Sequence, residues 1–126
     1  MNSWTAQELK VIDQADDLKI APYHADGVTT GTPTWIWEVV VENALYVRAY
    51  SGTSSRWYQS AIKQKAGKIH AANEVYDVAF EHVIDDLTNT KIDQAYRKKY
   101  SSSQYMTHMI GTQAKAATVR ISKAQM

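Results

Sequence analysis

Two neighbouring segments, 34–41 (TWIWEVVV) and 45–50 (LYVRAY), hold the chain's densest run of β-branched and aromatic residues. Such side chains favour extended strands that pack on a pleated surface. Only the residues Glu42-Asn43-Ala44 lie between the segments. The pattern therefore predicts an antiparallel hairpin with these residues as its loop.

The length of that loop decides which side chains share a face. With a three-residue loop, Val39 pairs with Val47, and Glu38 lies directly across from Arg48. A two-residue loop would shift the register by one residue and place Trp37 opposite Arg48. We prefer the longer loop because it keeps the apolar side chains together. One face then carries Trp35, Trp37, Val39, Val41, Leu45, Val47 and Ala49, and the other carries Ile36, Glu38, Val40, Tyr46, Arg48 and Tyr50.

Further strands and short helices surround the hairpin. Thr5 and Glu8 have the spacing of a capping box that opens a helix, with Leu9 and Ile12 on its buried side. About six mostly antiparallel strands indicate a small closed or partly open β-barrel, in one domain over 1–126. The other expected elements are a helix after residue 55 that stops at Gly67, a helix from 88 or 89 to 100, an irregular segment over 101–111, and strands over 18–24, 68–71, 75–84 and 118–122.

The hydroxyl-rich turn SGTSSR joins the hairpin to the following helix. A strand that ends in small residues at a helix start turns free backbone N–H groups toward one spot, where the helix dipole adds positive potential. Arg48 and Arg56 would add fixed positive charge. The turn thus predicts an anion site suited to a phosphate. The alternative is that Ser54 or Ser55 only caps the helix and Gly52 only turns the chain.

Composition narrows the possible functions. A net charge of +1 gives no bulk electrostatic reason to bind nucleic acid, and the absence of cysteine excludes disulfides, thiolate catalysis and zinc–sulfur sites. The four histidines lie far apart without metal-ligand spacing, so we expect no metal. We see no membrane-length apolar run and no signal peptide, so we expect no membrane partner and a cytoplasmic location. No nucleophile–base pair is present, so we name no catalytic residue and expect any chemistry to come from a cofactor.

The aromatic residues are unusual. Four tryptophans and eight tyrosines stand against one phenylalanine. Tryptophan and tyrosine combine an apolar ring with a polar group and are favoured on ligand walls and wet interfaces. The filling of a narrow barrel by bulky side chains explains the same composition equally well.

The run 32–83, from TPTWIWEVVV through SGTSSRWYQSAIKQK to YDVAFEHV, resembles the core of the pyridoxamine-phosphate-oxidase-like, FMN-binding split barrels. The whole chain resembles an uncharacterised bacterial family of that group, nearest to the deazaflavin-dependent nitroreductases. The resemblance implies a six-stranded antiparallel split β-barrel, mainly β with short helices. It also implies an oxidoreductase that binds FMN or a deazaflavin and acts on an unnamed substrate. The alternative is a non-catalytic split barrel that holds a flavin-like ligand or none.

The resemblance also implies site residues. In that superfamily, the end of the third strand and the turn beyond it hold the cofactor phosphate, and the second strand flanks the ring. Carried over by position, the cofactor-binding residues are Arg48, Ser51, Gly52, Thr53, Ser54, Ser55 and Arg56 for the phosphate, and Trp35 and Trp37 for the ring.

Two further expectations concern packing. Superfamily split barrels usually pair as two-fold dimers, so we expect a homodimer that covers the face with Ile36, Val40, Tyr46 and Tyr50. Trp57 lies in the first turn of the helix that follows the turn SGTSSR. We expect its side chain to be buried and to hold that helix on the barrel mouth, without contact to the ring.

Overall fold

The computed structural model describes residues 4–15 and 17–124. Its described strands form one seven-stranded antiparallel sheet with the order β2-β1-β5-β6-β7-β4-β3. The strands are β1 (Lys19–Pro22), β2 (Thr34–Trp35), β3 (Glu38–Val41), β4 (Ala44–Arg48), β5 (Ala66–Ala71), β6 (Glu74–His82) and β7 (Thr118–Lys123). The helices are α1 (Ala6–Ala15), the 3₁₀ turn η1 (Gly52–Ser54), α2 (Arg56–Gln64), α3 (Asp86–Lys99), α4 (Met106–Met109) and α5 (Thr112–Lys115).

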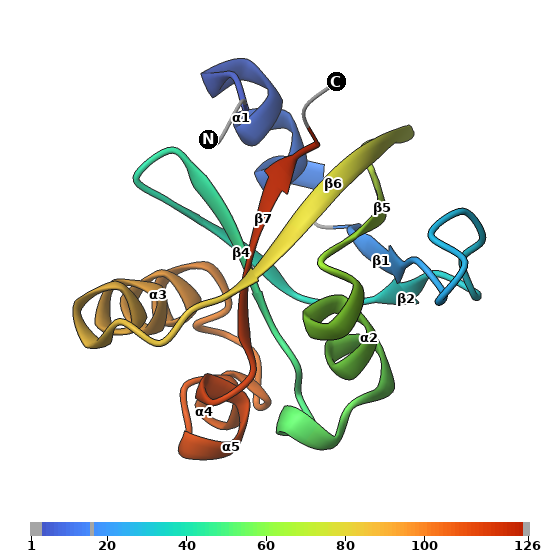
Figure 1. Ribbon diagram of the computed structural model, residues 1–126. Coiled ribbons are helices and arrows are strands. Elements are labelled where there is room, and N and C mark those ends of the chain that lie inside the picture. Colours follow the sequence, from blue (N-terminus) through green and yellow to red (C-terminus); the bar gives the residue numbers. More distant parts are fainter. Residues whose placement is uncertain (1–3, 16, 125–126) are drawn as a thin grey trace.

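The sheet curls into a half-barrel (Figure 1). Its two outermost strands, β2 and β3, are consecutive in the chain and are separated only by residues 36–37. The first part of the expected strand 34–41 pairs with β1, and the last part pairs with β4. The prediction of a mainly β protein with short helices is confirmed. The sheet is curled and has seven strands instead of the six expected. The difference arises because the segment 34–41 bends and forms two strands, β2 at one edge of the sheet and β3 at the other.

The hairpin between β3 and β4 has a two-residue turn. Glu42 and Asn43 both have positive φ, 49° and 65°, and β3 pairs Glu38 with Val47. Two-residue turns with both φ values positive match the natural twist of paired strands. The prediction of a three-residue loop with Glu38 opposite Arg48 is therefore wrong, and Ala44 is the first residue of β4.

Every residue of β4 is buried, because helices cover both faces of the sheet there. On one face, Leu45 and Val47 join a core that includes residues of α1 and α2. On the other face, Tyr46 packs with Val39 and with Ile92 of α3. Figure 1 shows α2 and α3 on opposite sides of the crossing strands β6 and β7.

The face that we expected a homodimer to cover is mostly buried within the chain itself. Ile36 and Tyr46 are each only 7% exposed, and Val40 packs against the first core. Of the four residues assigned to that face, only Tyr50 is exposed. The slipped register explains the difference, because residues expected on one face are divided between the two cores.

The predicted capping box is present at the start of α1. The Thr5 N–H donates to Glu8 Oε1 at 3.0 Å, and the Glu8 N–H donates to Thr5 Oγ1 at 3.0 Å. Leu9 and Ile12 are buried as expected. Both bonds are local, so the sequence motif was enough to predict them.

Gly67 does not end α2. The helix stops at Gln64, with Lys65 in the left-handed conformation, and Gly67 lies inside β5. A Cβ at Gly67 would stand 2.6 Å from Pro22 Cα, so glycine is needed there for the close approach of β1.

The segment expected to be irregular over 101–111 contains α4, which is followed by α5. α3 starts earlier than expected, at Asp86, because Asp85 caps it by accepting the Thr88 N–H at 2.7 Å.

Candidate functional site

A pocket of about 500 Å³ lies beside the junction between β4 and α2. Three segments that are distant in the sequence form it: 34–37 from β2 and its link to β3, 48–57 around the junction, and 105–109 at α4. We call it the aromatic pocket. Its lining residues are Thr34, Trp35, Ile36, Trp37, Arg48, Tyr50, Ser51, Ser55, Trp57, Tyr105 and Met109.

Five of its eleven lining residues are aromatic. Trp35 meets Trp37 edge to face with 6.3 Å between ring centroids, and Tyr50 meets Tyr105 in the same way at 6.2 Å. Trp35, Tyr50 and Tyr105 keep 52%, 47% and 51% of their surface exposed. Large aromatic side chains that converge while exposed are typical of surfaces that bind a partner or a ligand.

Two tyrosines at the C-terminal end of α3, Tyr96 and the C-cap residue Tyr100, hold Trp37 in place. Its ring stacks on Tyr100 at 4.4 Å, and its carbonyl accepts the Tyr96 hydroxyl at 2.9 Å. Burial raises the pKa of Tyr96, so this phenol stays protonated as a hydrogen-bond donor. One wall of the pocket is therefore fixed by the core.

The junction itself is a tight turn. The Gly52 N–H donates to Ala49 O at 2.9 Å, and the Ser55 N–H donates to Gly52 O at 3.1 Å. Ser55 occupies the N-cap position of α2 but makes no side-chain capping bond within the described residues. The first N–H groups of a helix have no intrahelical partner, so the start of α2 is open to an acceptor from a ligand.

Arg48 is fully buried and fully bonded. It is 1% exposed, and its NH1 group donates to Asp93 Oδ1 at 2.5 Å and to Met109 O at 3.1 Å. Its NH2 group donates to the backbone and side-chain oxygens of Asn89 at 3.2 and 3.1 Å, and its Nε donates to Thr118 Oγ1 at 2.9 Å. Each of its N–H donors has a protein acceptor, so this guanidinium ties β4 to α3, α4 and β7.

The charges around Arg48 are paired. Asp93 also accepts Lys115 Nζ at 2.8 Å. Glu38 forms its ion pair with Lys99 at 2.8 Å, and Lys99 reaches Asp13 of α1 at 2.9 Å. The expected Glu38–Arg48 partnership is replaced by two separate ion-pair networks.

The nine residues implied by the resemblance have three different locations. Trp35, Trp37, Arg48, Ser51 and Ser55 line the aromatic pocket. Gly52 is buried with φ +74°, while Thr53 and Ser54 are exposed on η1, outside the pocket lining. Arg56 lines a second, adjacent hollow.

Some wall residues were not predicted from the sequence. Trp57 is half-buried and lines the pocket, where the sequence indicated a buried support. Tyr50 was assigned to a dimer face. Tyr105 and Met109 lie in the segment expected to be irregular, and no local pattern marks them. Tyr50 had a usable signal, because it directly precedes the predicted turn.

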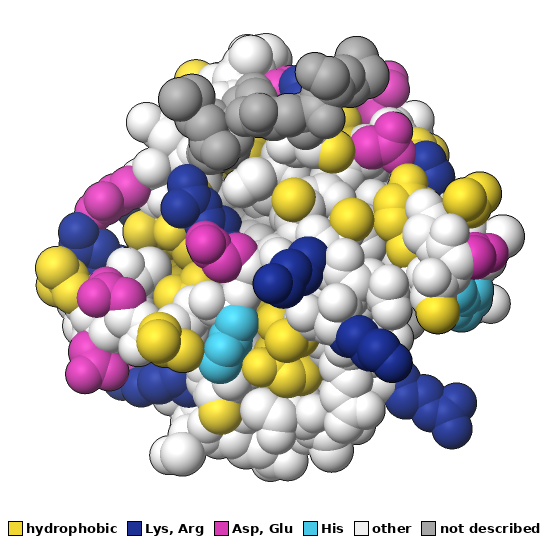
Figure 2. All heavy atoms as spheres, viewed as in Figure 1, with side chains coloured by type: hydrophobic (Ala, Val, Ile, Leu, Met, Phe, Trp, Pro, Cys, Tyr) yellow, Lys and Arg dark blue, Asp and Glu magenta, His cyan; other side chains and the backbone are white. Residues whose placement is uncertain are grey.

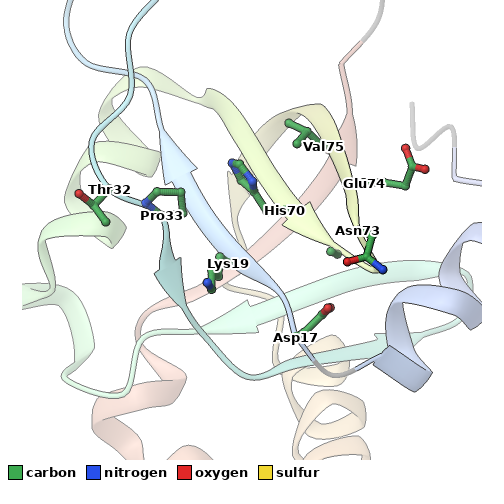
Figure 3. Close-up of a pocket in the computed structure, with 9 residues that line it drawn as sticks. Asp17, Lys19, Thr32, Pro33, His70, Asn73, Glu74 and Val75 are labelled. Carbon is green, nitrogen blue, oxygen red and sulfur yellow. The ribbon is translucent and has the colours of Figure 1, made fainter.

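Another hollow of about 460 Å³ lies on the outer side of β1 and β5 (Figure 3). Lys19 and His70, which are partners across these strands, line it together with the carboxylates of Asp17 and Glu74. Both signs of charge therefore meet in this hollow. Figure 2 shows that acidic and basic side chains also lie next to one another on part of the face in that view.

The chemistry of the aromatic pocket is limited. Its described lining includes no carboxylate, imidazole or thiol, and the one charged group, Arg48, is already paired. Among the described residues, no group of three or more acidic or histidine side chains lies together as a metal site would require. None of the described helices is long and apolar enough to span a membrane. The pocket suits binding by stacking and hydrogen bonding more than acid–base chemistry.

Comparisons with known proteins extend this picture. No curated protein matches the sequence. A solved structure with a similar fold is that of the conserved hypothetical protein Rv2991 from Mycobacterium tuberculosis, at a TM-score of 0.64 and 10% sequence identity. That likeness covers 98% of this chain and 81% of the other, and at this identity it shows the fold alone.

The family is shown by sequence. Residues 8–121 match the model of DUF2255, which is described as an uncharacterised protein conserved in bacteria. The prediction of an uncharacterised bacterial family is confirmed at that level. Since the match spans most of the described core, from α1 to β7, the chain belongs to the DUF2255 family.

Proposed function

We propose that this protein binds a flavin or deazaflavin cofactor, with its ring in the aromatic pocket, and acts as an oxidoreductase. One observation carries the proposal: Trp35, Trp37, Tyr50, Trp57 and Tyr105 converge on one pocket from three distant segments. Flat aromatic walls favour a planar ligand, because stacked and edge-to-face contacts add to the burial of apolar surface. The pocket volume of about 500 Å³ lies within the range of cofactor sites.

The cofactor phosphate would lie at the start of α2. The open N–H groups of the first turn and the Ser55 hydroxyl are the donors that suit it. Arg48 does not fit the phosphate role implied by the resemblance, because its donors are all used inside the protein. Arg56, at the first position of α2, is the cation that fits this role.

When bound, such a ring supplies hydride transfer to and from a substrate. The protein's own part would be to bind, orient and shield it. Trp37 is fixed by Tyr96 and Tyr100 and would orient the ring, while Tyr50 and Tyr105 at the rim would exclude water.

The proposal is tested by titrating the protein with FMN and with a deazaflavin while following tryptophan fluorescence and cofactor absorbance. We expect saturable binding that falls about tenfold or more in Trp35→Ala, from the loss of a stacking contact and its buried area. Leu87→Ala is the matched control, since Leu87 is 65% exposed on α3 and lines none of the three hollows described above. No binding of either compound by the wild-type protein would overturn the proposal.

A carrier without turnover is the second candidate. The described pocket lining offers no carboxylate, imidazole, amine or thiol for proton transfer, which favours storage or delivery of the ligand over catalysis. The two functions separate in a stopped-flow experiment on the reduced, cofactor-loaded protein. If the protein accelerates oxidation of the cofactor by a nitroaromatic or quinone acceptor relative to free cofactor, it is an enzyme. If it slows that oxidation, it is a carrier.

The homodimer stays a prediction, now with a different covered surface. The exposed rim of Trp35, Tyr50 and Tyr105 is the aromatic surface that a second copy would cover together with the ligand. Light scattering should give about twice the chain mass of 14.2 kDa at micromolar concentration. A mass equal to one chain, with cofactor present, would contradict it.

A further inference from the structure

A small hollow of about 220 Å³ lies on the face of the sheet that α3 covers, where β6 leads into that helix (Figure 1). It is separate from the aromatic pocket, since the two share no lining residue. Strands β4, β6 and β7, the link over 83–85 and the first turn of α3 surround it. We call it the polar hollow, and its lining residues are Tyr46, Glu81, His82, Val83, Ile84, Asp85, Thr88 and Arg120.

Three of these residues form one row across the sheet. Arg120 of β7 pairs with Tyr46 of β4 on one side and with Glu81 of β6 on the other. Directly paired residues project from the same face of an antiparallel sheet, with Cβ atoms about 5 Å apart. The row therefore places a phenol, a guanidinium and a carboxylate side by side along one wall of the polar hollow.

The guanidinium of Arg120 has no partner among the described residues. Arg120 is half-buried, and its Nε atom is buried without an acceptor in that part of the chain. The side chain forms no ion pair there either, although Glu81 is its neighbour in the row. A buried donor without an acceptor costs free energy, and water, an ion or a ligand commonly satisfies such a group. Arg48 shows the contrast, because each of its donors has a protein acceptor.

The other polar groups of the hollow differ in whether they already have partners. Asp85 accepts the Thr88 N–H at 2.7 Å and the Thr88 hydroxyl at 2.6 Å, and His82 Nε2 donates to a backbone carbonyl at 3.0 Å. Tyr46 and Glu81, by contrast, make no side-chain hydrogen bond or ion pair with any residue that the structure describes. Burial raises the pKa of Tyr46, so its hydroxyl stays protonated and is available as a donor.

The charges of the polar hollow favour a ligand that carries both signs. A simple anion would be attracted by Arg120 and repelled by the carboxylates of Glu81 and Asp85, whereas a zwitterion meets an opposite charge at each end. The planar fork of a guanidinium suits a carboxylate, and a carboxylate such as Glu81 accepts from an ammonium group. Val83, which is half-buried, and Ile84, which is 78% exposed, add an apolar part to the wall.

We infer that the polar hollow binds a small zwitterion, namely a free α-amino acid with an apolar side chain. The ligand carboxylate accepts hydrogen bonds from Arg120 and Tyr46, and its ammonium group donates to Glu81. Its side chain packs on Val83 and Ile84. The volume of about 220 Å³ lies below the range of about 300–1,000 Å³ that drug-sized ligands occupy, so it suits a ligand of this size. The inference goes beyond the proposed function, because no residue of the aromatic pocket takes part in it.

The test titrates L-valine, isovalerate and isobutylamine into the isotope-labelled protein without flavin, while NMR follows the Arg120 Nε–H. Isovalerate is valine without its ammonium group, and isobutylamine is valine without its carboxylate. We expect saturable binding of valine at millimolar concentration. Each analogue should bind about tenfold more weakly or less, because it lacks one charge-assisted interaction. If valine gives no saturable shift, or if isovalerate binds as tightly as valine, the inference is overturned.

Variants assign each contact, with binding followed on the ligand signals. Tyr46→Phe keeps the buried ring and removes only the hydroxyl, so it should weaken valine by about tenfold, as should Arg120→Gln. Glu81→Gln should weaken valine and not isovalerate. Glu74→Gln is the matched control, because Glu74 is an exposed carboxylate of the same strand that does not line the polar hollow. An affinity for valine that is unchanged in Arg120→Gln, or equal in Glu81→Gln and Glu74→Gln, would overturn the inference.

Discussion

Arg48 and Arg56 stand on either side of the same turn, yet their surroundings are opposite. Arg48 is buried, with a protein acceptor for each of its N–H donors, whereas Arg56 is exposed, lines a hollow and has no ion pair or side-chain hydrogen bond among the described residues. One arginine therefore holds the scaffold together and the other is available to a ligand. Whether an arginine beside this turn can bind a ligand therefore depends on the elements that pack against it, and not on its position in the sequence.

The largest expected effect comes from breaking the Arg48 network. Arg48→Met should lower the free energy of unfolding by about 3–5 kcal/mol, because it leaves buried acceptors on α3, α4 and β7 without their donor. Arg56→Met should change it by less than about 0.5 kcal/mol. Urea denaturation of both variants measures the difference. Equal losses would show that the two arginines do not divide the roles in this way.

Gly52 tests how tightly the turn between the two arginines is fixed. It has φ +74°, and an added Cβ would meet Gln113 Cγ at 2.7 Å and Gln113 O at 2.9 Å. Gly52→Ala should therefore destabilise the protein by about 2–3 kcal/mol, from backbone strain and overpacking together.

Gly27 supplies the matched control for that substitution. Its φ is similar, +70°, but nothing lies within 4 Å of an added Cβ. Gly27→Ala should cost only the backbone strain, about 1 kcal/mol. If thermal unfolding finds equal losses in the two variants, the contact with Gln113 contributes nothing.

Tyr96 separates the fixed wall of the pocket from its exposed rim. Tyr96→Phe removes the hydroxyl that donates to Trp37 O at 2.9 Å and should cost about 1–2 kcal/mol. Tyr105→Phe, at the rim, should leave stability unchanged, since Tyr105 is 51% exposed. Chemical denaturation of the pair checks this. A larger loss for Tyr105→Phe would contradict the assignment of wall and rim.

The smallest effect concerns the helix that binds Arg48. Hydrogen bonds from the Thr88 side chain and backbone hold the pKa of Asp85 below its ordinary value, so this cap adds stability above about pH 4 and loses it as pH falls through the lowered pKa. The melting temperatures of the wild type and Asp85→Asn should differ most near pH 6 and converge toward pH 2. If the difference in melting temperature does not change with pH, the stabilisation comes from the shape of the Asp85 side chain and not from its charge.

The sequence predicted the structure correctly where the contacts join residues close together in the chain. The Thr5–Glu8 capping box and the mainly β character follow from residue types at short spacing, and both are confirmed. The hairpin register was wrong, because loop length depends on whether Glu42 and Asn43 adopt positive φ, and sequence pattern favoured apolar pairing instead.

The site could be predicted only in part, for a similar reason. The residue types of the turn drew attention to it, and the resemblance implied Trp35 and Trp37; the structure places both tryptophans on one pocket lining with Ser51 and Ser55. The acceptors that occupy Arg48 come from Asn89, Asp93 and Met109, more than forty residues away. Nothing near Arg48 in the chain indicates that α3, α4 and β7 will together use all of its donors.

The side chains that α3 sends to β3 have one more consequence, for association. β3 ends the strand order, and its backbone carbonyls would otherwise invite another strand. Tyr96 donates to Trp37 O, while Lys99 and Tyr100 donate to Glu38 O at 3.0 and 3.1 Å. These acceptors are therefore occupied before a foreign strand can pair with them. The contacts that position the pocket wall thus also occupy Glu38 O, a carbonyl of the edge strand β3, and so disfavour the pairing of a foreign strand at that point.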